Sequence, residues 1–259
     1  IAGGVEYVVT LGTTGETATL TADEKKEVIA HTIKVVDGRV PILLGHGGNN
    51  TQALIDGLET MDLTGIAGLL SVSPYYNKPT QKGIIAHYKA LAAATDLPVV
   101  LYNVPGRTGS NLAASTTLHL AREVDNIKAI KEASGSIEQC MAIIKDRPED
   151  FLVLSGEDAL TLPMLSFGMD GVISVVANAY PKEYSDMVRA GLAGDFETAR
   201  QLHFELLDLI DLLFAEGNPG GVKCALKHLE ICGDALRLPL ANVSADTDKA
   251  IKQAIKRMA

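Results

Sequence analysis

Residues 98–102, Pro-Val-Val-Leu-Tyr, form an almost uninterrupted apolar run between two longer segments of helical periodicity. The segments at 80–94 and 113–123 both repeat apolar residues at the spacing of an amphipathic helix. A short apolar run without polar alternation is typical of a strand that is covered on both faces. Residues 80–123 therefore predict a helix, a strand and a helix in succession, which is the pattern of parallel βα units.

The same alternation extends over the first two thirds of the chain. Six further apolar runs have the length of strands and lie at residues 5–9, 41–44, 65–72, 127–131, 151–154 and 171–176. Helical patterns occur at 21–36, 50–63, 137–145 and 158–167, and the first begins with a capping-box sequence, Thr21 followed by Glu24. These units predict an α/β fold of the (β/α)8 TIM-barrel class.

A barrel of this class has eight strands, whereas the sequence shows seven. Residues 1–4, Ile-Ala-Gly-Gly, look like the end of a helix and its glycine cap. An open sheet would leave two unpaired edges. We therefore expect the first strand, and most of its helix, to precede residue 1.

Beyond residue 180 the sequence shows helical periodicity alone, at 182–192, 195–215, 221–231 and 245–258. The predicted division is a (β/α) barrel at residues 1–180, which carries the active site, and a C-terminal helical extension at 181–259. No obvious linker separates them, so the extension is expected to pack as part of the same unit.

The composition is that of a globular, acidic protein. Hydrophobic residues make up 47% of the chain, and the net charge is −9 at pH 7. This charge argues against nucleic acid or an anionic membrane as a partner, and no apolar run reaches the ~18–20 residues of a membrane span. The three cysteines form no CxxC pair, and no signal sequence opens the chain. A cytoplasmic location is therefore expected.

The strand predicted at residues 127–131 ends in Lys131 after a mostly apolar sequence. Strand ends carry the active site in a βα barrel, so this side chain is expected at the barrel mouth. Removal from water lowers the pKa of a lysine, and the neutral amine can then attack a ketone to form an imine. A solvated lysine, or one paired with Glu132 or Glu157, remains the commoner interpretation of position alone.

Residues 12–15, Gly-Thr-Thr-Gly, follow the first predicted strand, and their backbone N–H groups could hold an anion. The spacing differs from that of a nucleotide P-loop, which also requires a lysine. The hydroxyls of Thr13 and Thr14 suit a small carboxylate and a proton relay. An ordinary tight turn before the helix capped by Thr21 is an equally good interpretation.

Three further residues near strand ends have side chains that suit such chemistry. Tyr76 and Tyr102 carry phenols that can transfer protons beside a cationic nitrogen. Arg107 lies in a loop containing Pro and Gly, where a guanidinium can bind a carboxylate through two hydrogen bonds. Taken singly, each is more often a packing tyrosine or a solvated arginine.

The usual sequence patterns for metals and nucleotide cofactors are missing. None of the six histidines has HxxxH or HExxH spacing, and only His46 follows a predicted strand, where a supporting role is expected. Neither GxSxG nor GxGxxG occurs. We therefore expect no metal and no cofactor in catalysis, and covalent catalysis by a lysine amine is the best interpretation.

Four segments taken together resemble the dihydrodipicolinate synthase family, which belongs to the pyruvate-dependent class I aldolases. They are Gly-Thr-Thr-Gly-Glu at 12–16, Pro-Tyr-Tyr-Asn at 74–77, Tyr-Asn-Val-Pro-Gly-Arg-Thr-Gly at 102–109 and Ile-Lys-Glu-Ala-Ser-Gly at 130–135. Their order and spacing match the family, and the resemblance extends from residue 1 to the C-terminal helices. It implies a Schiff base with pyruvate and a role in diaminopimelate and lysine biosynthesis.

The resemblance also assigns roles to individual residues. Lys131 would form the imine with pyruvate, and Thr14 would bind the pyruvate carboxylate. Tyr102, Thr13 and Tyr76 are similar to the family's proton relay, in which Tyr76 reaches the active site of a neighbouring subunit.

Arg107 resembles the residue that holds the carboxylate of the second substrate, aspartate semialdehyde. Gly156 and Ile173 fall where the family lines the site with backbone groups. The resemblance further implies a homotetramer composed of two tight dimers.

Other members of the superfamily share the lysine and a nearby tyrosine. N-acetylneuraminate lyase and 2-keto-3-deoxy sugar acid aldolases are therefore the alternative functions, and a barrel that has lost catalysis is a third. Arg107, after Tyr-Asn-Val-Pro-Gly, favours the synthase, and the full set of catalytic residues argues against a non-catalytic barrel.

Two features depart from the family pattern. Gly220 and Gly221 replace the usual Ile-Pro, and this change is expected to loosen the start of the following helix near Val222. The second departure concerns the family's inhibitory lysine site, where Asn49 and Tyr75 match but Ala22, Lys25 and Ala53 replace the usual His, His and Glu. A positive charge at residue 25 and a lost carboxylate at residue 53 predict weak or absent inhibition by lysine.

Overall fold

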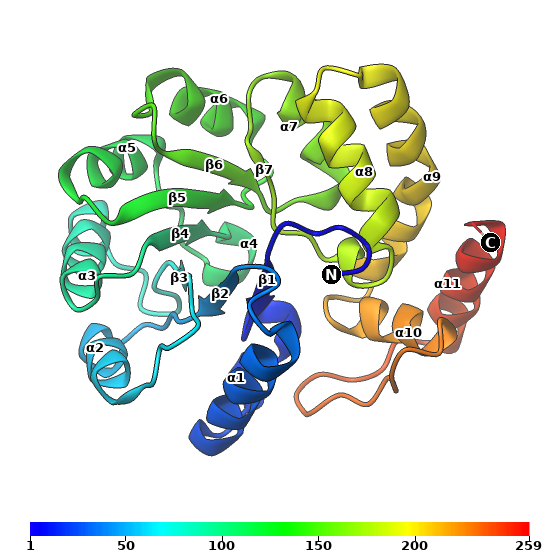
Figure 1. Ribbon diagram of the computed structural model, residues 1–259, viewed down its shortest axis with the longest axis horizontal. Helices are drawn as coiled ribbons and strands as arrows, with labels where there is room; N and C mark the ends of the chain where they lie inside the picture. The colour runs from blue at the N-terminus through cyan, green and yellow to red at the C-terminus, as the bar shows by residue number, and fades with distance from the viewer. Residues whose placement is uncertain (259) are drawn as a thin grey trace.

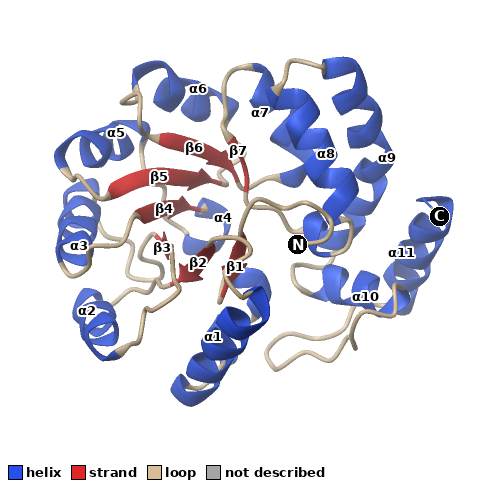
Figure 2. Ribbon diagram, in the orientation of Figure 1, coloured by secondary structure: helices blue, strands red, loops and turns tan. Residues whose placement is uncertain are grey.

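The computed structural model of this protein describes residues 1–258, which form a curled parallel sheet surrounded by helices (Figures 1 and 2). Its seven strands pair in sequence order. They are β1 (Val8–Thr10), β2 (Ile42–Gly45), β3 (Gly68–Val72), β4 (Val99–Asn103), β5 (Ile127–Glu132), β6 (Leu152–Ser155) and β7 (Gly171–Val172). The parallel order confirms the predicted α/β barrel class.

The helices lie on the outer side of the sheet and continue beyond it (Figure 1). Those that alternate with the strands are α1 (Ala22–Val36), α2 (Thr51–Thr60), α3 (Gln81–Ala93), α5 (Ala114–Glu123), α6 (Ile137–Asp146), α7 (Thr161–Ser166) and α8 (Pro181–Leu192). The C-terminal helices are α9 (Phe196–Phe214), α10 (Gly220–His228) and α11 (Ala245–Met258). Helix α8 contacts β7 and also α9. The division of the chain at residue 180 stays a prediction.

Successive strand residues point to opposite faces of the sheet, and this alternation divides the buried apolar residues into two clusters. Val100 and Ala129 belong to a small cluster inside the curled sheet. Their neighbours Leu101 and Ile130 belong to the large cluster between the strands and the helices. Every residue of β4 is buried, as the apolar run at 98–102 predicted.

Among the described strands, β1 pairs with β2 alone and β7 with β6 alone. Near these two edges the hydroxyl of Tyr7, the residue before β1, donates a hydrogen bond to the Val172 carbonyl oxygen of β7 at 2.8 Å. The presence of a further strand before residue 1 stays a prediction.

The strand predicted at 171–176 is wrong beyond Val172. Residues Val176–Asn178 form a 3-10 turn, η4, instead. The cause is the buried Asp158, whose Oδ2 accepts hydrogen bonds from the N–H groups of Val175 at 2.9 Å and Val176 at 2.7 Å. These two donors are therefore engaged by a side chain and not by a neighbouring strand.

Two helical details also differ from the prediction. A short helix, α4 (Pro105–Thr108), begins at a proline and ends at Gly109, whose φ of 67° is left-handed. Helix α10 begins at Gly220, and a Cβ on Gly221 would lie 2.4 Å from the Leu213 carbonyl oxygen. The departure at residues 220–221 thus permits a close approach between α9 and α10, and Val222 is buried.

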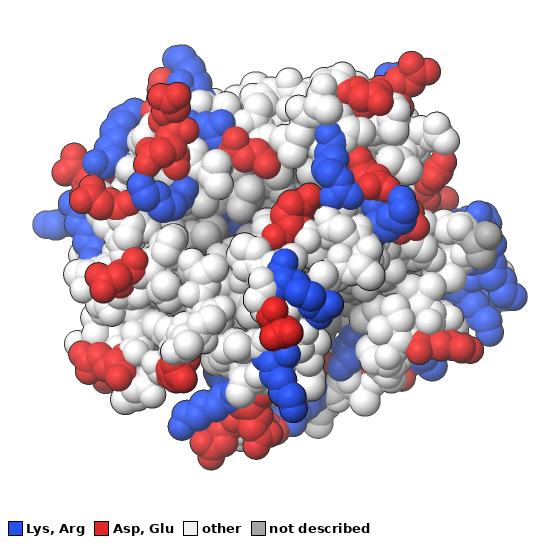
Figure 3. Space-filling model, viewed as in Figure 1, with Lys and Arg blue, Asp and Glu red and all other residues white. Residues whose placement is uncertain are grey.

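Charged side chains of both signs lie intermixed on the face drawn in Figure 3 and form no basic patch there. In the part of the chain that the structure describes, no helix combines the length and apolar character needed to cross a membrane.

Candidate active site

A cavity of about 920 Å³ lies within the curled sheet and opens among the loops at the strand ends. Seven of the predicted site residues line it, namely Thr13, Thr14, Tyr102, Arg107, Lys131, Gly156 and Ile173. These residues come from five separate parts of the chain, and the parallel order of the strands brings them together.

Lys131 is the central cation of this cavity. It is paired in register with Tyr102 on β4, and its Nζ lies 4.6 Å from the centre of the Tyr102 ring. Only 9% of Lys131 is exposed. Burial lowers the pKa of Lys131 to about 8, the Arg107 charge acts in the same direction, and the Asp158 and Glu157 charges oppose it. At pH 7 roughly a tenth of this amine is therefore unprotonated, far more than for a free lysine.

Gly156 permits the lysine to occupy this position. A Cβ at residue 156 would lie 2.8 Å from Lys131 Cε and 2.6 Å from Ala133 Cβ. Both distances are too short for carbon atoms that are not bonded to each other. The backbone of residue 156 cannot easily move to relieve them, because this residue directly follows β6 and its N–H donates to the Glu132 carbonyl oxygen at 2.8 Å. The absence of a side chain here is thus a requirement of the site.

Tyr102 is buried beside the lysine, and its phenol is associated with Thr13. Burial raises the pKa of Tyr102, whereas the side-chain hydrogen bond to Thr13 and the charge of Arg107 oppose that increase. Thr13 begins a 3-10 turn, η1 (Thr13–Gly15), directly after β1. A neutral phenol with a hydroxyl partner can accept and donate protons beside the Lys131 amine.

Asn218 is a site residue that sequence reasoning did not single out. It is buried and lines the cavity, and its Nδ2 donates to Thr14 Oγ1 at 2.9 Å. The backbone carbonyl of Asn218 also accepts a hydrogen bond from Arg107 at 3.4 Å. Asn218 therefore connects η1, which contains Thr14, to the short helix α4, which contains Arg107. In the sequence, the feature that could have indicated this role is the position of Asn218 before Pro219, between two predicted helices.

Two acidic residues influence the charges in the cavity, namely Glu157, which lines it, and Asp158, which is buried without lining it. Burial raises the pKa of Glu157, and the Asp158 charge adds to that effect, while Lys131 opposes it. Burial likewise raises the pKa of Asp158, against hydrogen bonds from the Val176 and Val175 backbone and the Ser174 side chain. The cavity thus holds both signs of charge in partial isolation from water.

Tyr76 lies apart from these residues. Its side chain is 88% exposed, its φ is 70°, and it does not line the cavity. Asn49 and Tyr75 are in contact, since Asn49 Nδ2 donates to the Tyr75 carbonyl oxygen at 3.2 Å, and their role in a lysine site stays a prediction. The predicted entry of Tyr76 into a neighbouring active site stays a prediction.

Comparisons with known proteins agree with this geometry. A profile of the dihydrodipicolinate synthetase family matches residues 1–258. The chain is 50% identical over 258 residues to a 4-hydroxy-tetrahydrodipicolinate synthase of Parabacteroides distasonis, a match that covers 100% of this chain and 87% of the relative.

Two solved structures are also similar. The first is the chloride-inhibited dihydrodipicolinate synthase of Acinetobacter baumannii complexed with pyruvate, with a TM-score of 0.95, 39% identity and coverage of 98% of this chain and 87% of that one. The second is a monomeric dihydrodipicolinate synthase variant, with a TM-score of 0.96, 38% identity and coverage of 98% and 86%. With the family profile matched along residues 1–258, this chain belongs to the dihydrodipicolinate synthetase family.

Proposed function

We propose that this chain is a 4-hydroxy-tetrahydrodipicolinate synthase, a lyase that condenses pyruvate with L-aspartate 4-semialdehyde through a Schiff base on Lys131. The observation that carries this proposal is the buried Lys131 amine, held over Tyr102 at 4.6 Å with its pKa lowered to about 8. Compared with a free lysine, this lowering increases the neutral fraction at pH 7 a few hundredfold.

In the first half of the reaction, the neutral Lys131 amine attacks the ketone carbon of pyruvate. The resulting carbinolamine loses water and becomes an imine. The Tyr102 phenol is positioned to supply the proton that the departing hydroxyl needs. Loss of a methyl proton then converts the imine to an enamine, and Tyr102 with Thr13 provides the route for that proton.

In the second half, the enamine carbon attacks the aldehyde carbon of aspartate semialdehyde and forms the new C–C bond. The amino group of the same substrate then attacks the imine carbon and closes the six-membered ring. This transfer breaks the bond to Lys131 and restores the free amine. The only net by-product is the water lost when the imine formed, so no oxidant or reductant is consumed.

Substrate carboxylates are assigned to the two residues that Asn218 connects. Thr14 binds the pyruvate carboxylate, with help from the backbone of η1, and Arg107 binds the carboxylate of aspartate semialdehyde. Asn218 bonds to both Thr14 and Arg107 and so holds these two residues at a fixed separation. This arrangement supports the assignment of one carboxylate to each. Gly156 and Ile173 also line the cavity and are assigned to contact the substrate through their backbone groups.

The proposal needs no cofactor, since the imine formed on Lys131 is the electron sink for loss of the methyl proton. It includes a homotetramer in which Tyr76 completes the proton relay of a neighbouring subunit, supported by the 88% exposure of that side chain. Three free thiols are compatible with a cytoplasmic location. Activity per subunit that stays constant on dilution to monomers would remove Tyr76 from the relay.

A comparison of substrates tests the proposal against the sugar acid aldolases. With pyruvate present, turnover is expected with aspartate semialdehyde. A coupled reductase that consumes the cyclic product measures its rate. The reverse cleavage of N-acetylneuraminate and of 2-keto-3-deoxygluconate is expected to be negligible. A larger kcat/KM for either sugar acid would reassign the chain to that activity.

A further inference from the structure

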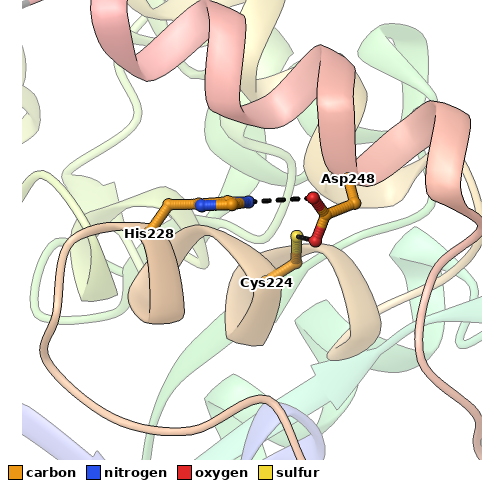
Figure 4. Close-up of side chains that lie close together, drawn as sticks. All are labelled: Cys224, His228 and Asp248. Atoms are coloured by element: carbon orange, nitrogen blue, oxygen red, sulfur yellow. Dashed lines mark hydrogen bonds and ion pairs between the residues drawn. The ribbon is translucent and has the colours of Figure 1, made fainter.

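Three side chains that can bind metal ions meet between the last two helices, away from the catalytic cavity (Figure 4). Cys224 and His228 are four residues apart on α10, so they lie on the same face of that helix. Asp248 projects from α11 between them, with Oδ2 3.3 Å from the Cys224 sulfur and Oδ1 3.1 Å from His228 Nε2. The three donor atoms all lie within 4.8 Å of one another.

We propose that Cys224, His228 and Asp248 form a binding site for a thiophilic divalent cation, Zn²⁺ foremost, that clamps α11 to α10. A tetrahedral zinc ion with one sulfur, one nitrogen and one oxygen ligand requires donor atoms ~3.3–3.6 Å apart. The Asp248 carboxylate is close to this range on both sides, with Oδ2 at 3.3 Å from the Cys224 sulfur and the other oxygen, Oδ1, at 3.1 Å from His228 Nε2. The three donor atoms lie within 4.8 Å of one another, so binding requires side-chain rotations that draw them together around the ion.

The ligand set also suits zinc chemically. Thiolate, imidazole and carboxylate are its common protein ligands, and the sulfur selects against Mg²⁺ and Ca²⁺. Cys224 is 1% exposed, while 34% of the Asp248 side chain is exposed, so the site is anchored in the core and open to solvent on one side. A water molecule can occupy the fourth position. On binding, the cation replaces the thiol proton, which is released to solvent.

A nucleophilic cysteine is a poorer interpretation of the same cluster. In such an arrangement the imidazole lies between the thiol and the carboxylate, whereas here the carboxylate lies in the middle (Figure 4). Burial, and then the Asp248 carboxylate, raises the pKa of the Cys224 thiol to about 12. A free thiol in this position is unreactive without a cation.

The neighbouring cation, Lys227, provides an internal probe of the proposal. Its Nζ lies 2.7 Å from Asp234 and 3.9 Å from Asp248. A bound Zn²⁺ would be repelled by this ammonium, so Lys227→Gln is expected to tighten zinc binding severalfold. If the cluster were only a hydrogen-bonded contact between helices, that change would create no zinc affinity.

The site lies on the helix that positions one end of the catalytic cavity. Helix α10 begins two residues after Asn218, which bonds to Thr14. A clamp between α10 and α11 therefore stabilises the C-terminal helices by linkage, independently of the reaction on Lys131. The proposal does not rest on the proposed function.

Titration of the full chain with Co²⁺, a spectroscopic substitute for Zn²⁺, tests the site. We expect one equivalent to bind with a thiolate-to-cobalt charge-transfer band and intense tetrahedral d–d bands, both removed by Zn²⁺. Cys224→Ala should remove the charge-transfer band, and Asp248→Asn should weaken binding at least about tenfold. Cys232→Ala and His119→Gln change an exposed cysteine and an exposed histidine and should leave the spectrum unchanged.

Circular dichroism establishes that each variant is folded, and thermal melting gives an independent measurement. The same concentration of Zn²⁺ should raise the Tm of the wild type and of Cys232→Ala by equal amounts, and that of Asp248→Asn by less. The absence of a charge-transfer band in the wild type, or a band that survives Cys224→Ala, would overturn the proposal. If Cys224→Ala does not fold, the other two variants decide the question. The proposal would be overturned if Lys227→Gln did not tighten metal binding and Asp248→Asn did not weaken it.

Discussion

Lys131 and Tyr102 occupy paired positions on adjacent parallel strands, and the lysine nitrogen lies 4.6 Å from the centre of the tyrosine ring. Register alone would place any two residues side by side at this point. The chemistry comes from burial, which lowers the pKa of the amine and raises that of the phenol. The phenol is thereby kept in its uncharged form near neutral pH and can donate a proton, and the amine has a neutral, nucleophilic fraction far larger than that of a free lysine.

The pH dependence of imine formation is the first prediction. Only the neutral amine attacks, so the rate constant at low pyruvate concentration should rise about tenfold per pH unit below pH 8 and level off above about pH 8. Rapid quenching with borohydride at each pH measures it. The matched control is the amine of Nα-acetyl-lysine, whose rate should continue to rise well above pH 8. An enzyme profile that followed the control would show that Lys131 is not perturbed.

Gly156→Ala is expected to impair catalysis through Lys131. The added methyl group would lie 2.8 Å from Lys131 Cε, so the lysine must move away from Tyr102. We expect kcat to fall about a hundredfold and the free energy of unfolding to decrease by about 1–3 kcal/mol. Gly233→Ala is the control, because a Cβ there meets nothing within 4 Å. Equal effects of the two substitutions would remove the special role of Gly156.

Arg107→Ala should separate the two substrates. Loss of the guanidinium is expected to raise the KM for aspartate semialdehyde at least about tenfold, because a charge-assisted hydrogen-bonded pair is lost. Trapping of pyruvate on Lys131 should persist, with its pH inflection moved upward, since Arg107 helps to lower the pKa of Lys131. Arg107→Lys retains the charge without the paired hydrogen bonds, so its KM for aspartate semialdehyde should lie between those of the wild type and Arg107→Ala. An unchanged KM for the semialdehyde in Arg107→Ala would refute the assignment.

Weak regulation by lysine is the fourth prediction. Asn49 and Tyr75 are in contact. Burial lowers the pKa of His46 and the charge of Lys25 adds to that effect, so the Lys25 ammonium lies close to His46. A lysine ammonium should therefore bind poorly. Steady-state assays are expected to give an inhibition constant above about 1 mM. The double variant Lys25→His with Ala53→Glu should become more sensitive, and submillimolar inhibition of the wild type would contradict the prediction.

Much of the barrel and of the site could be predicted from sequence because both depend on local patterns. Apolar runs predicted the strands in order, and strand ends then placed Thr13, Tyr102 and Lys131 near one another. The pKa of Lys131 could be predicted in direction, since a lysine at the end of an apolar strand loses water.

The parts that were missed depend on side chains that act over long sequence distances. The buried Asp158 takes the N–H groups of Val175 and Val176, and an apolar pattern at 171–176 contains no sign of that. Asn218 reaches Thr14 across 204 residues of sequence, so only the folded chain shows the contact. Cys224 and Asp248 meet for the same reason, through the packing of α10 on α11.

The formation of the imine on Lys131 is the central claim of this account. Incubation with pyruvate and borohydride, followed by intact-mass measurement and peptide mapping, tests it most directly. One pyruvate-derived adduct per chain is expected on the peptide that contains Lys131, with none in Lys131→Arg. An adduct on a different lysine, or no adduct in a preparation that still turns over aspartate semialdehyde, would contradict the mechanism.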